Sequence, residues 1–119
     1  MQKVIQASGV FAATHATPDQ GGAGFRGLHL SINMTVVPGV DTVTPHIQGK
    51  DAMGNYYDIL VGPAIVAIGD TILKVGEGIL AAANAAATDI LPDVWRVNFV
   101  HSAGTNFTYE VSVNLKADF

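Results

Sequence analysis

The chain has no cysteine among its 119 residues, which excludes disulfide bridges and thiolate metal sites. It also has little charge, because Asp, Glu, Lys and Arg make up only 13% of it, against about a quarter of an ordinary soluble domain. The six Lys and Arg residues are scattered along the sequence, and the net charge is −4. A nucleic-acid surface needs clustered basic side chains to neutralise phosphates, so nucleic acid is not an expected partner.

Long apolar runs are missing as well, although 49% of the residues are hydrophobic and the mean hydropathy is +0.33. The longest candidate, residues 59–75, is broken by Gly62-Pro63, Gly69-Asp70 and Lys74, and it does not reach the roughly 18 to 20 apolar residues that span a bilayer. Residues 1–9 lack the apolar stretch of a signal peptide. We therefore expect no membrane partner. The scarcity of charge favours surfaces that are buried against other chains, and a monomer covered by Thr, Ser, Asn and Gln is the alternative.

What the sequence does contain is alternation with a period of two. Apolar residues occupy every second position of residues 28–36 and of residues 107–115, with polar residues between them. This pattern is typical of a β-strand with one buried face. Residues 43–48, 57–61 and 95–99 show shorter versions of it. Tyr57, Ile59 and Val61 are expected to face inward.

The alternating segments predict an all-β, single-domain protein, either an antiparallel β-sandwich of the jelly-roll kind or a small barrel. The alanine-rich residues 81–87 allow one or two helical turns or a long crossover loop before Pro92. The expected core contains residues from most of these strands: Leu30, Ile32, Ile47, Ile59, Trp95, Val97, Phe99, Tyr109, Val111 and Val113.

The first residues differ from the rest. Residues 4–11 have strand character, but the polar, glycine-rich residues 15–24 that follow them are typical of a flexible connection. We therefore expect residues 1–24 to form an N-terminal arm and linker, and residues 25–119 to form the sandwich domain. The alternative, that residues 4–11 are an ordinary first strand of the sandwich, remains open.

No catalytic, cofactor-binding or metal-binding constellation is evident, and we expect the protein not to be an enzyme. The four histidines, His15, His29, His46 and His101, lack the close spacing of metal motifs, and we expect them to be solvated or to lie at interfaces. Asp51 begins a faint calcium-loop pattern without the alternating oxygen ligands, so a turn-forming role is favoured. The serines lack a nucleophile-elbow context. Tyr56 lies at an outward position and remains a candidate for stacking on a sugar ring.

Three motifs carry a resemblance. They are Ile47-Gln48-Gly49-Lys50-Asp51 at the end of a strand, the turn and aromatic return strand of residues 54–60, and Leu91-Pro92-Asp93-Val94-Trp95-Arg96-Val97. Over residues 28–115 the chain resembles small all-β structural proteins of tailed bacteriophage virions, of the capsid decoration (cement) kind. The resemblance implies a component of the capsid surface that is made in the host bacterial cytoplasm, without catalytic residues or cofactors. It implies as partners the major capsid protein and further copies of the chain, in a homotrimer.

A capsid decoration protein clamps neighbouring subunits, and an extended arm can do so by adding a strand to a capsid sheet edge. The arm residues that would make this contact are Val4, Ile5, Val10 and Phe11. Two other roles stay open: a structural protein of the phage tail or neck, and a glycan-binding β-sandwich module.

Overall fold

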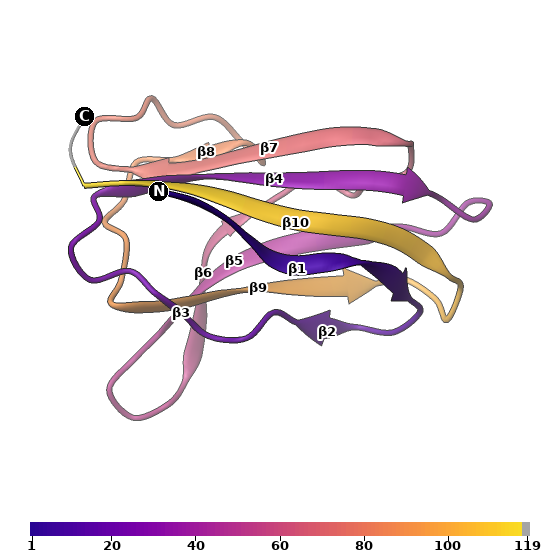
Figure 1. Cartoon of the computed structure of the whole chain (residues 1–119), viewed down its shortest axis with the longest axis horizontal. Helices are drawn as coiled ribbons and strands as arrows, with labels where there is room; N and C mark the ends of the chain where they lie inside the picture. The colour runs from indigo at the N-terminus through magenta and orange to yellow at the C-terminus, as the bar shows by residue number, and fades with distance from the viewer. Residues whose placement is uncertain (118–119) are drawn as a thin grey trace.

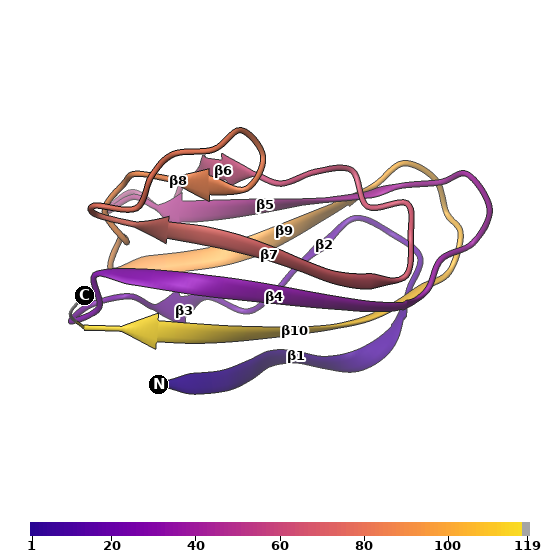
Figure 2. The ribbon, with the colours of Figure 1, turned by 90° about the horizontal axis from the view of Figure 1, so that it is seen from above.

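The computed structural model describes residues 1–117, and these form ten strands and no helix. No segment of this part of the chain is a helix long and apolar enough to cross a membrane. The strands form two sheets that lie face to face (Figures 1 and 2). The predicted all-β sandwich is therefore confirmed, and of the two architectures expected the sandwich is the one observed.

The first sheet has five strands, and their spatial order differs from their order in the sequence. Four of them pair antiparallel, and only the short last strand pairs parallel with its neighbour. The strand order is β1 (Gln2–Phe11), β10 (Phe107–Lys116), β4 (Gly27–Val36), β7 (Gly69–Gly76) and β8 (Ala86–Ala87).

The second sheet is antiparallel throughout and has β9 near its centre. Its order is β2 (His15–Ala16), β9 (Val94–His101), β5 (Val43–Lys50) and β6 (Tyr56–Val61), with β3 (Gln20–Gly21) also pairing with β9. The alanine-rich region contributes only β8 and a loop, so the crossover loop is observed and the helical turns are not. A positive φ of 59° at Asn84 shows a turn within that loop.

The core lies between the sheets and follows the period-2 pattern. Along β10, the residues from Phe107 to Leu115 alternate between buried and partly exposed, and β5 and β9 do the same. Of the core residues expected from the sequence, all are buried except Ile59, which is partly buried and packs against the others.

The predicted phase of β6 is wrong, and a β-bulge is the reason. Asp58 pairs with Gln48, but Leu60 rather than Ile59 pairs with Ile47, so Ile59 is an extra residue on the bulged strand. Beyond the bulge the inward and outward positions exchange. Leu60 becomes buried at 8% exposure, and Val61 is 36% exposed instead of facing the core. Tyr57, before the bulge, lies at the end of the sheet and is 48% exposed.

The structure places residues 1–24 within the two sheets. β1 pairs with β10 along most of its length, and β2 and β3 both pair with β9. Ile5 is buried at 9% exposure, and Phe11 packs against the core. Of the two alternatives for this segment, the structure shows the first strand of the sandwich, because Ile5 is buried in the core and Phe11 packs against Tyr109 of β10.

Gly22 shows why the glycine-rich segment is not a free linker. Its amide donates to the carbonyl of Asp93 at 2.7 Å. A Cβ on this residue would lie 2.0 Å from the carbonyl oxygen of Pro92. Only glycine therefore allows the backbone before β4 to lie this close to the segment that leads into β9.

Replacing Gly22 with alanine should lower the free energy of unfolding by about 1 to 3 kcal/mol, because the backbone of one of the two segments must move. Gly21 is the matched control, since a Cβ there would meet nothing within 4 Å. Urea unfolding of both variants is the measurement. Equal stability of the Gly21→Ala and Gly22→Ala proteins would contradict the close approach.

Candidate functional site

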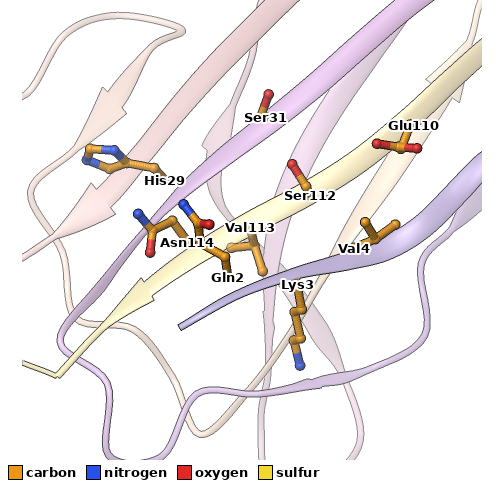
Figure 3. Close-up of a pocket in the computed structure, with 9 residues that line it drawn as sticks. All are labelled: Gln2, Lys3, Val4, His29, Ser31, Glu110, Ser112, Val113 and Asn114. Carbon is orange, nitrogen blue, oxygen red and sulfur yellow. The ribbon is translucent and has the colours of Figure 1, made fainter.

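The first candidate site is a hollow of about 500 Å³ on the outer face of the first sheet, over β1, β10 and β4 (Figure 3). Ser31 and Ser112 are register partners, and because paired residues of antiparallel strands point to the same face, two small side chains lie together there. Longer side chains surround them. The lining consists of Gln2, Lys3, Val4, His29, Ser31, Glu110, Ser112, Val113 and Asn114.

The polar side chains of this hollow are not used within the protein. Over residues 1–117, no hydrogen bond joins the side chains of Gln2, His29, Ser31, Glu110, Ser112 or Asn114 to another part of the chain. Hydroxyl, amide and imidazole groups supply both donors and acceptors. Figure 3 shows the lysine of β1 pointing away from the two serines. The hollow can therefore hydrogen-bond a polar partner.

The outer face of the second sheet is different, because its polar side chains pair with one another. The Asp19 carboxylate accepts from the Tyr56 hydroxyl at 2.7 Å and from the Lys50 ammonium at 3.0 Å. The tyrosine hydrogen bond first, and the lysine second, lower the pKa of Asp19. The hydrogen bond with Asp19 raises the pKa of Lys50 in turn.

The network continues across the sheet. Arg96 donates to Gln48 at 2.9 Å, Gln48 donates to Asp58 at 3.0 Å, and His46 Nδ1 lies 3.2 Å from the same carboxylate. The guanidinium carbon of Arg96 also lies 3.4 Å from the ring centroid of Tyr56. One face of that ring is therefore already covered by a cation. A sugar stacking on Tyr56 would have only the opposite face.

The four histidines take three different environments. His29 lines the hollow, and His46 belongs to the network on the second sheet. His15 and His101 meet between the sheets, with ring centroids 5.8 Å apart. Within residues 1–117 there is no group of three or more His, Cys, Asp or Glu that could hold a metal ion.

The expectation that all four histidines are solvated or at an interface is wrong for His101, which is only 9% exposed. The sequence contained a signal that could have found it. Trp95, Val97 and Phe99 face inward on β9, and the same period places His101 inward as well. Asp51, in contrast, does form a turn as expected, because its carboxylate accepts from the amides of Met53 and Asn55, both at 2.9 Å.

The four arm residues divide into two pairs. Val4 and Val10 are 56% and 62% exposed, so they are accessible to a partner. Ile5 and Phe11 instead anchor β1, since Ile5 is buried and the Phe11 ring lies 4.9 Å from that of Tyr109. Only the first pair is free to contact another chain while β1 stays in the sheet.

A second hollow, also of about 500 Å³, lies at the opposite edge of the sandwich between β6 and the loop around β8. Most of the side chains that line it are aliphatic, although polar atoms contribute much of its surface, and its lining comprises Ile59, Leu60, Val61, Ala81, Ala82, Ala83, Asn84, Ala86, Ala87 and Thr88. Nearby along the chain, Leu80 is 90% exposed and Ile90 is 62% exposed. The sandwich thus has two lateral edges of different character.

Comparisons with known proteins show a similar fold in a solved structure. No family model and no curated protein matches the sequence. The fold is similar to that in the crystal structure of the SPBc2 prophage-derived protein YomS, with a TM-score of 0.56 and 9% sequence identity. The match covers 98% of this chain and 92% of that chain. The two proteins therefore share a β-sandwich over nearly their whole lengths.

Proposed function

We propose that the chain is a structural protein of a phage virion, and that it binds the major capsid protein lattice as a decoration protein on the capsid surface. The observation that carries the proposal is the fold shared with a prophage-derived protein over 98% of the chain. The phage-like motifs of residues 47–51, 54–60 and 91–97 support it independently. In this role the protein acts through its surfaces and needs neither a catalytic residue nor a cofactor.

The outer face of the first sheet is the surface that we assign to the capsid. Its polar side chains have no partners within residues 1–117, and the exposed Val4 lies beside them on β1. An interface needs such unpaired donors and acceptors around an apolar contact. The second sheet satisfies its own polar groups, so its outer face has less to gain from binding.

The proposed assembly is a homotrimer, and the two lateral edges are compatible with it. A ring of three copies requires a head-to-tail interface, in which one surface of each copy meets a different surface of the next. The β1 edge carries Val4 and Val10, and the β6 edge carries the second hollow, whose side chains are mostly aliphatic and include Val61. One edge of each copy facing the other edge of its neighbour would bury apolar surface from both.

Electron cryomicroscopy of purified particles of the phage that encodes the chain tests location and symmetry together. We expect a three-fold cluster of sandwich-shaped density on the outer capsid surface. Density in the tail or neck would favour the other virion role. Absence of the chain from the particle would overturn the proposal and leave the glycan-binding module as the role to test, with a glycan array.

Capsid binding by purified variants tests the assigned surface. Ser31→Arg places a long cation in the hollow of the first sheet and should weaken binding by about tenfold or more, a loss of about 1.4 kcal/mol or more. Thr44→Arg is the matched control, because Thr44 faces outward on β5 of the second sheet and is equally half-buried. If Thr44→Arg weakens binding and Ser31→Arg does not, the capsid contact lies on the second sheet.

A further inference from the structure

A cluster of six rings lies between the sheets, near the point where β1 turns into β2. Its closest stacked contact joins Phe11 and His15, whose ring centroids are 4.4 Å apart with an interplanar angle of 13°. His15 lies 5.5 Å from Phe99, and Phe99 lies 5.0 Å from Tyr109. The cluster draws on β1, β2, β9 and β10: Phe11, His15, Phe99, His101, Phe107 and Tyr109.

His101 is the member of this cluster whose hydrogen bonding is incomplete. Its Nε2 atom lies 2.9 Å from the hydroxyl of Tyr109, a residue with no exposed surface. Its Nδ1 atom is buried and has no partner. A neutral imidazole leaves one nitrogen unsatisfied there, but a protonated ring would have two donors and only one partner. Burial of an unpaired charged donor is costly, so this site suits the neutral ring alone.

The surroundings offer the charged form no compensation. Burial first, and the neighbouring His15 second, lower the pKa of His101 below its ordinary value. From β10 it faces Tyr109 and the edge of Phe107, and its register partner on β5 is Val43. The carboxylate of Asp41, in the loop before β5, is engaged by the hydroxyl of Thr105 at 2.7 Å. No ion pair of residues 1–117 involves His101.

The lid over this site, residues 2–16, is formed by β1 and β2, each of which pairs with a single neighbouring strand. Phe11 and His15 lie on β1 and β2, and β2 pairs with β9 through only His15 and Ala16. The pairing of β1 with β10 is interrupted twice, between Val4 and Gln6 and again before Gly9. By contrast, β10 and β9 each pair with a second long strand, β4 and β5, and would remain in their sheets without the lid.

One polar contact connects the lid to the rest of the cluster, and two more lie within the lid itself. The Thr14 hydroxyl accepts from the amide of His101 at 3.1 Å. His15 Nε2 lies 2.9 Å from the side-chain oxygen of Gln6, and His15 Nδ1 lies 3.2 Å from the carbonyl of Ala13. Movement of residues 2–16 would break the Thr14 contact and uncover the ring of His101, including its unpaired Nδ1.

We propose that this cluster is an acid-sensitive latch, in which proton uptake by His101 favours a state where residues 2–16 leave the sandwich while its other strands remain folded. The direction follows from linkage. In the open state His101 is solvated and titrates near 6.5, and in the closed state it titrates lower. The closed state is therefore favoured fully above about pH 6.5 and loses this advantage as the pH falls. Between these two pKa values each pH unit should favour opening by up to about tenfold, as a proton is taken up.

Hydrogen exchange from about pH 7.5 to about pH 5 tests the latch without any partner, so its outcome is independent of the proposed capsid role. Protection factors, which correct for the intrinsic pH dependence of exchange, are compared for amides of β1 and β2 and for amides of β4. Below about pH 6.5 we expect protection of β1 and β2 to fall as the pH is lowered, by up to about tenfold per pH unit, until the pH reaches the lowered pKa of His101 in the closed state. The β4 amides should stay better protected at every pH.

Two variants remove the titrating group. His101→Gln keeps a side chain that can hydrogen-bond Tyr109, and His101→Phe fills the apolar space, so at least one should fold. Either should make β1 protection independent of pH over this interval. His29→Gln is the matched control, because His29 is exposed on the outer face of β4, and it should retain the wild-type response. The latch would be overturned by constant β1 protection in the wild type, by an unchanged slope in a folded His101 variant, or by equal protection of β1 and β4.

Discussion

Replacing Trp95 with alanine should lower the free energy of unfolding by about 3 to 5 kcal/mol. Trp95 is the largest side chain in the protein that has no exposed surface. Its register partner on β5 is Gly49, and the space above that glycine is already filled by Tyr57 and Pro92. Truncation of a side chain packed among these neighbours therefore leaves a cavity. Urea unfolding is the measurement.

Val100→Ala is the control for this truncation, because Val100 lies on the same strand with 36% exposure and should cost less than about 1 kcal/mol. Trp95→Phe adds a second comparison. The indole Nε1 of Trp95 is buried without a partner, so this variant removes an unsatisfied donor and should cost less than the loss of area suggests. A loss well under 1 kcal/mol for Trp95→Ala would place the ring at the surface and disprove the register of β9.

The strands and their faces could be predicted because period-2 alternation is a local property of the sequence. The expected phase holds for residues 95–99 of β9 and residues 107–115 of β10, with Trp95 and Tyr109 in the core. It does not hold for β6, because the bulge at Ile59 depends on how the strand pairs with β5. A bulge adds one residue without a compositional signal. The sequence alone therefore predicts that Ile59 is buried, whereas the structure buries Leu60.

Composition was a poor guide to the first 24 residues. The three glycines within residues 21–24 suggested a flexible backbone, but at Gly22 the absence of a side chain allows the backbone to lie close to Pro92. This contact joins segments far apart in the sequence, so no local pattern reports it. Glycine permits flexibility and tight packing equally, and only the structure distinguishes the two.

The candidate surfaces could not be predicted from the sequence either, because they depend on the order of the strands in the sheets. The hollow of Figure 3 joins the start of the chain to its last strand and to β4, three segments that only the sheet brings together. His15 and His101 are likewise far apart in the sequence, and the pairing of β2 with β9 brings their rings together. A sequence pattern gives the face on which each side chain lies, and the topology decides which faces adjoin.

Deletion of residues 1–13 should destabilise the sandwich by several kcal/mol. Ile5 would no longer bury its side chain, and Tyr109 would lose the ring of Phe11, where burial of one such side chain contributes about 1.5 to 3 kcal/mol. β10 would also lose the ladder that joins it to β1 from Gln2 to Phe11, and each net hydrogen bond contributes about 0.5 to 1.5 kcal/mol. Thermal and urea unfolding of the shortened chain measure the loss.

The control for this deletion is a chain in which only the exposed β1 side chains are changed. Val4→Ala with Val10→Ala removes side chains that are 56% and 62% exposed, and it should leave the melting temperature almost unchanged. On capsids, the same double variant should bind more weakly if Val4 and Val10 make the proposed contact. If the shortened chain melts at the wild-type temperature, β1 contributes nothing to the stability of the fold. That result would favour the hypothesis that residues 1–24 form a detachable arm and linker. Weak binding without loss of stability in the double variant would assign β1 two separate tasks, with Ile5 and Phe11 holding the sheet and Val4 and Val10 facing the partner.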